Sequence, residues 1–136
     1  MNRFCAVAFL VMMTGVVNVK AQYDPVSADT KASYASVKDV LLRAADKMPE
    51  ENYSFRTTPQ VRTYGEMIAH IVDAQTAFCA TVKGEQKRGN AAGKTSKAEL
   101  SAALKASFDY CDQVYDSMTD AAGAQIVKMQ IGKAKV

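Results

Sequence analysis

The chain has 136 residues, of which 49% are apolar and 23% are charged, and its formal net charge is +3. This length suits one domain, and the lack of long runs of valine, isoleucine and threonine predicts an all-α fold. No stripe of basic residues with interleaved aromatic residues appears along the chain. The composition therefore argues against a nucleic-acid-binding protein.

Residues 1–21 have the features of a signal peptide. Arg3 supplies a positive start, and residues 4–17 form an apolar segment that is short for a bilayer span. Small residues stand at the −3 and −1 positions relative to Gln22, which predicts cleavage before that residue. We expect export to the periplasm or secretion; an uncleaved membrane anchor is the alternative.

The expected mature chain is a single domain over residues 22–136. Loss of Arg3 and Lys20 brings the 17 basic residues down to 15, against 14 acidic residues. A net charge this close to zero gives no attraction to an anionic membrane or to nucleic acid. We therefore expect neither as a partner after cleavage.

Two long helices are predicted in the first two thirds of the domain. The first covers Ala28–Met48, because Pro49 disfavours helical backbone in the residue before it. The second covers Thr63–Lys83, begins with a capping box in which Glu66 is the third helical residue, and ends at Gly84. The predicted core stripe of the first helix is Tyr34, Val37, Leu41, Ala44 or Ala45, and Met48. The predicted stripe of the second, with Val61 just before it, is Val61, Tyr64, Ile68, Ile71, Gln75, Phe78 and Val82.

A third helix is predicted over Lys97–Met118, after a polar, glycine-rich loop. Ser96 and Glu99 fit a second capping box at its start. Thr119 is placed to cap a further helix that runs through Met129. The predicted core stripe of the third helix is Leu100, Leu104, Phe108, Cys111, Tyr115 and Met118. Three long amphipathic helices need a fourth element to close one core.

Several segments resemble the DinB-like (DNA-damage-inducible) superfamily of four-helix bundles, and especially its exported bacterial members. The similarity runs from about residue 34 to residue 129. Its pattern is spread over many positions and is not a single diagnostic motif. The residues that carry it are Phe55-Arg56, Thr58-Pro59, Arg62 to Glu66, Ile68 to Ile71, Cys79, Gly84-Glu85 and Ala103 to Asp112.

The resemblance implies a bundle whose four helices run up, down, down and up. This chain ends where the last helix of the family should follow, so we expect that helix to be truncated or absent. Relatives of this kind are described as divalent-metal-dependent enzymes, some of them of hydrolase or thiol-transferase type. Their metal is held by one histidine on the second helix and a pair on the last helix. His70 matches the first ligand, and the pair has no counterpart here.

His70 is the one candidate metal ligand, and zinc or nickel is the expected ion. It is the only histidine in the chain and lies at the border between the apolar and polar faces of its helix. Glu66 and Asp73, one turn away on either side, could add oxygen ligands, since such sites need several converging donors. A surface histidine with local hydrogen bonds explains the position equally well. No residue is assigned a catalytic role.

The mature domain has two cysteines, Cys79 and Cys111, and an even number in an exported protein favours a disulfide. They lie at similar depths in the second and third helices. Parallel helices would therefore bring them level, whereas a tight hairpin would separate them too far for a bridge. The long loop permits the parallel arrangement that the resemblance implies. We predict a Cys79–Cys111 disulfide; two buried thiols are the alternative.

Two functions fit these observations. The first is an exported DinB-like enzyme that depends on a divalent metal and has an incomplete metal site. The second is a non-catalytic bundle, structural or partner-binding, that has lost metal binding. A fragment whose missing final helix carries the rest of the metal site is a third reading. With three helices, an open apolar seam would be exposed, and such a surface is usually covered by a partner. We therefore expect a homodimer through this seam.

Overall fold

A computed structural model describes residues 24–125, and all of its regular elements are helical. The helices are α1 (Pro25–Lys47), a short 3-10 helix η1 (Glu50–Ser54), α2 (Tyr64–Val82), α3 (Lys97–Ser117) and α4 (Asp120–Gly123). The predicted all-α helical bundle is confirmed. The predicted signal peptide and its cleavage site lie outside the described residues. The helix that was predicted to start after Thr119 and run through Met129 is shorter, because α4 ends at Gly123.

The helix ends follow the local signals in the sequence. At the start of α2 the Thr63 hydroxyl accepts a hydrogen bond from the Glu66 amide (3.1 Å), and the Glu66 carboxylate accepts one from the Thr63 amide (2.7 Å). Gly84 ends α2 with φ at +70°, a conformation that glycine adopts without steric cost. The α3 capping box is only half formed, because the Glu99 carboxylate binds the Ser96 hydroxyl instead of its amide.

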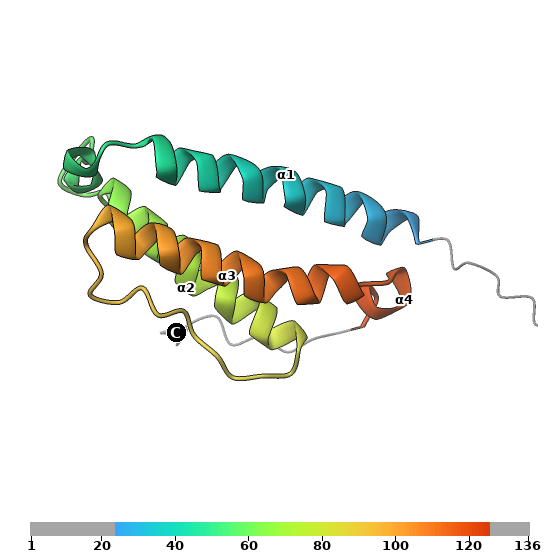
Figure 1. The fold of residues 1–136 in the computed structure, drawn as a ribbon. Helices are drawn as coiled ribbons and strands as arrows, with labels where there is room; N and C mark the ends of the chain where they lie inside the picture. The colour runs from blue at the N-terminus through green and yellow to red at the C-terminus, as the bar shows by residue number, and fades with distance from the viewer. Residues whose placement is uncertain (1–23, 126–136) are drawn as a thin grey trace, which may run out of the picture.

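The third helix lies at the centre of the fold, with α1 and α2 packed on either side of it. Figure 1 shows α2 and α3 running in the same direction, while α1 runs the opposite way. Side-chain contacts agree: Gln75 on α2 donates to Ser107 on α3 (3.1 Å), and Cys79 lies beside Cys111. The first three helices therefore have the expected up, down, down order.

The largest part of the core lies between α3 and its two neighbours. It contains Leu100, Leu104 and Phe108 of α3, all at most 1% exposed. Gly65 lets the start of α2 come close to this core, since a Cβ there would lie 3.2 Å from both Leu100 and the Tyr53 carbonyl. Tyr53 in η1 closes the end of the core and donates a hydrogen bond to the Ala45 carbonyl of α1 (2.7 Å).

The predicted core stripe is right for most of α3 and wrong for much of α2. Val61, Phe78 and Val82 were expected in the core and are 45–51% exposed. Most of the residues that α2 buries stand one position after the predicted ones. The buried residues are Gly65, Ile68, Val72, Thr76, Cys79 and Ala80. The reason is that α2 contacts α3 through its small residues, and the larger apolar residues beside them have no neighbouring helix among residues 24–125.

The first helix differs from prediction in a similar way. Val37 was expected in the core and is 54% exposed, whereas Ala45 is buried and Tyr34 and Leu41 are partly buried. The helix also begins three residues earlier than predicted, at Pro25. Proline is well suited to the first helical position, because it has no amide hydrogen to satisfy there. Within residues 24–125 no helix is both long enough and apolar enough to cross a membrane.

Candidate functional site

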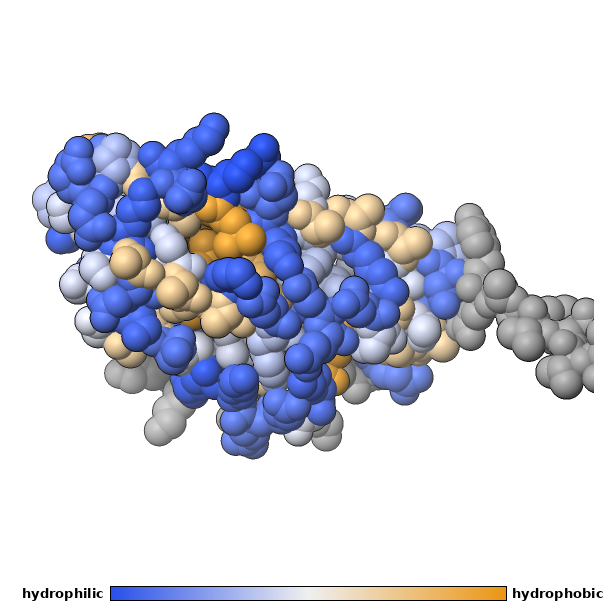
Figure 2. Space-filling view, in the orientation of Figure 1, coloured by the Kyte–Doolittle hydropathy of each residue, from blue (hydrophilic) through white to orange (hydrophobic). Residues whose placement is uncertain are grey.

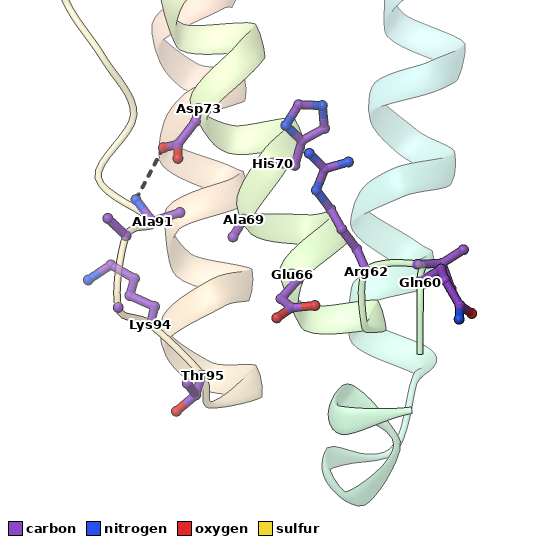
Figure 3. Close-up of a pocket in the computed structure, with 12 residues that line it drawn as sticks. Gln60, Arg62, Glu66, Ala69, His70, Asp73, Ala91, Lys94 and Thr95 are labelled. Atoms are coloured by element: carbon purple, nitrogen blue, oxygen red, sulfur yellow. Dashed lines mark hydrogen bonds between the residues drawn. The ribbon is translucent and has the colours of Figure 1, made fainter. Parts of the chain in front are cut away.

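Two hollows meet at the middle of α2, and His70 lines both of them. The first is a polar pocket of about 630 Å³ between α2 and the loop that leads into α3. Figure 3 shows its labelled side chains, with Glu66, His70 and Asp73 on α2 and Lys94 on the loop. This is the place where the sequence predicts metal ligands.

Glu66 is held by the backbone at the start of its own helix. Its carboxylate accepts the Thr63 amide hydrogen, and this bond lowers the pKa of Glu66 despite the opposing effect of desolvation. The nearby positive charges of Arg56 and Arg62 act in the same direction. Glu66 therefore stays ionised near neutral pH, with one oxygen committed to the capping box.

Asp73 holds the loop that returns from α2 to α3. Its carboxylate accepts a hydrogen bond from the amide of the buried residue Ala91, at 3.4 Å. Gly89 passes so close that a Cβ there would lie 2.6 Å from the Asp73 Cα. Both contacts give Asp73 a structural explanation that needs no metal.

The described residues do not form the metal site that the resemblance implies. His70 is exposed, and in Figure 3 its ring lies apart from the carboxylates of Glu66 and Asp73. Figure 3 also shows the Arg62 side chain extending toward His70. Across residues 24–125 no group of three histidine, cysteine, aspartate or glutamate side chains could hold a metal ion. Metal binding by His70 stays a prediction that this donor set does not support.

The second hollow is apolar and lies between α1 and α2, over α3. We call it the α1–α2 groove; its volume is about 320 Å³. Its floor includes Tyr34 of α1 and Tyr115 of α3, whose rings stack with centroids 3.7 Å apart. The residues that line the groove are Tyr34, His70, Ile71, Ala74, Gln75, Phe78, Cys79 and Tyr115. An open apolar seam was expected, but the sequence did not indicate between which helices it would lie.

Tyr34 is held in place by a polar cluster that the sequence reasoning missed. Its hydroxyl lies 2.9 Å from the Asp112 carboxylate and 3.1 Å from the Phe108 carbonyl, and Lys38 forms a 2.6 Å ion pair with Asp112. Burial and then the bond to Asp112 raise the pKa of Tyr34, so its hydroxyl remains a donor. Asp112 is 78 residues from Tyr34 and 74 residues from Lys38, and no local pattern could pair it with them.

The two cysteines of the described residues meet beneath this groove. Cys79 and Cys111 are paired across the α2–α3 interface, with Cα atoms 5.5 Å apart. Both are buried, and Val114 packs beside them. The arrangement is the level one that parallel helices were expected to give. Formation of the bond in the exported protein stays a prediction.

Comparison with known proteins supports the kinship inferred from the sequence. The family model of the DinB superfamily matches residues 33–135, which is most of the chain. No curated protein and no solved structure gives a significant match. The matched region contains the whole of α2 and α3, both candidate hollows and the cysteine pair. This all-helical chain belongs to the DinB superfamily.

Proposed function

We propose that this protein is an exported, non-catalytic DinB-like bundle that acts by binding a partner along the α1–α2 groove. One observation carries the proposal. Within residues 24–125, the exposed large apolar side chains of the long helices belong to α1 and α2, and none belongs to α3. Apolar side chains gathered on two helices beside a groove are typical of an interaction surface.

The state of the polar pocket supports a binding role over a catalytic one. The carboxylates of Glu66 and Asp73 both accept backbone hydrogen bonds, and each bond has a clear part in folding. A general acid or base needs a neighbour that tunes its proton affinity toward the working pH. His70 has no carboxylate within hydrogen-bonding distance among the described contacts, so nothing identifies it as half of such a pair.

Site-specific photo-crosslinking in cells tests this binding role. A photoreactive amino acid at Phe78 lines the groove, whereas one at Phe55 is also exposed but lies outside it. We expect crosslinks to a discrete protein species from position 78 and not from position 55. Crosslinks from neither position, in a chain that folds and is exported, would contradict the proposal.

A divalent-metal-dependent enzyme of hydrolase or thiol-transferase type is the second candidate. Membership of the DinB superfamily favours it, together with the presence of His70 and Glu66 at one polar pocket. A calorimetric titration of the purified protein with Zn²⁺ or Ni²⁺ separates the two candidates. The binding proposal expects no stoichiometric binding and no change on His70→Ala. A tight one-to-one site that is lost in His70→Ala would favour the enzyme.

A further inference from the structure

The apolar surface around the α1–α2 groove is larger than the groove itself. On α2, Phe78 lines the groove, and Met67 and Val82 extend the same stripe toward the two ends of the helix. On α1, Val37 lies one turn from Tyr34. These four exposed residues and the groove lining form what we call the apolar face.

We infer that a second copy of this chain covers the apolar face, packed about a twofold axis. This inference rests on the proposed function and names the partner. In a twofold interface the same patch is used on both subunits, so it must offer complementary features to itself. The apolar face has two complementary features. The groove is a hollow, and the half-exposed side chains of Phe78 and Val82 form a ridge beside it.

The charge of the face favours a copy of itself over a charged partner. None of the residues that line the groove is acidic or basic except His70. Two identical neutral surfaces can meet without like-charge repulsion, which is costly at an interface. A partner selected by charge would find no ion-pairing group here. Figure 2 shows that the face formed by α1, α3 and the return loop is mostly hydrophilic, apart from one hydrophobic patch at the upper left of the view.

The size of the apolar face is also suitable for an interface between two copies of the chain. Nineteen residues of α2 give a length of about 28 Å, and two helices side by side are about 20 Å wide. The projected area is on the order of 600 Å², close to the roughly 800 Å² of accessible surface that each partner buries in a standard interface.

Sedimentation or light scattering of the purified full chain at micromolar concentrations tests the inference. We expect a dimer that Phe78→Glu and Val37→Glu each weaken by about tenfold or more, because a carboxylate would be buried without a partner. Phe55→Glu is the matched control and should leave the dimer unchanged. Circular dichroism should show that all three variants keep the helical content of the wild type.

The outcomes separate this inference from the proposed function. A chain that stays monomeric would overturn the inference that a second copy covers the apolar face. A dimer that Phe55→Glu weakens as much as Phe78→Glu would overturn it too. If a monomeric chain still crosslinks from position 78 to a different protein, the proposed function stands and only this inference fails. Crosslinks from position 78 to residues 126–136 of the same chain would also overturn it. Crosslinked species of twice the chain mass support it.

Discussion

Asp120 of α4 caps the N-terminus of the first helix by binding Ser27, which is 93 residues away in sequence. Its carboxylate accepts hydrogen bonds from the backbone amides of Ser27 (2.7 Å) and Val26 (3.3 Å) at the start of α1. In return, the Asp120 amide donates to the Asp24 carboxylate (3.1 Å). The first turn of a helix has free amide hydrogens, and here α4 satisfies two of them. The contact therefore closes the domain by joining its first and last described elements.

Replacing Asp120 tests this closure. Asp120→Asn should lower the melting temperature at neutral pH by a few degrees, because a charged acceptor at a helix N-terminus is lost. The Ser27 amide holds the pKa of Asp120 below its usual 3.8, so the stabilisation is complete above that value and is lost as the pH falls through the lowered pKa. The difference between wild type and variant should shrink at acidic pH. A difference that grew as the pH fell would contradict the capping role, and Asp39→Asn in the middle of α1 is the control.

The cysteine pair should be oxidised in the native protein and should contribute strongly to stability. Mass analysis without reductant should find no free thiols at Cys79 and Cys111. The two residues are 32 positions apart, and closing a loop of this size stabilises a fold by roughly 3–4 kcal/mol. Reductant should therefore shift the urea midpoint of the wild type. It should leave a Cys79→Ala/Cys111→Ala variant unchanged, and two free thiols in the native protein would refute the prediction.

The Tyr34 hydroxyl should stabilise the contact between α1 and α3. Tyr34→Phe keeps the ring that stacks on Tyr115 and removes only the bonds to Asp112 and to the Phe108 carbonyl. We expect a loss of about 1 kcal/mol in the free energy of unfolding. Tyr110→Phe is the matched control, because its hydroxyl bonds to Glu85 at the exposed surface. Equal effects of the two changes in urea denaturation would count against the Tyr34 cluster.

The return loop should depend on the absence of a side chain at position 89. A Cβ on Gly89 would lie 2.6 Å from the Asp73 Cα and 2.9 Å from its amide nitrogen, closer than atoms approach without a shift. Gly89→Ala should therefore move the loop away from α2 and cost about 1–3 kcal/mol. Gly123→Ala, where the new methyl group meets nothing within 4 Å, should be close to neutral. Denaturant midpoints and hydrogen exchange at Ala91 would show both effects.

Features that depend on a few neighbouring residues were predicted well. The Thr63–Glu66 capping box and the Gly84 helix end need contacts within about one turn, so their residues identify them directly. The buried face of α3, with Leu100, Leu104 and Phe108, was also predicted correctly. That helix has a neighbour on each side, and its apolar stripe therefore matches its buried surface.

The orientation of α2 could not be predicted in the same way. An apolar stripe shows which residues favour burial, but not which neighbouring helix is present to bury them. Phe78 belongs to such a stripe and is 48% exposed, while the smaller Thr76 and Ala80 are buried. Close approach to α3 needs small side chains, and this requirement turned the larger residues toward the groove.

The sequence by itself determined the three long helices and most of their ends, because capping residues, glycine and proline act through local backbone and side-chain chemistry. Only the tertiary structure decided that α2 and α3 run parallel, which brings Cys79 and Cys111 together. A long loop can return along the helix or turn tightly, and its composition allows both. The same is true of the Asp120 cap on Ser27, since hydrogen bonds between distant segments depend on how the whole chain packs.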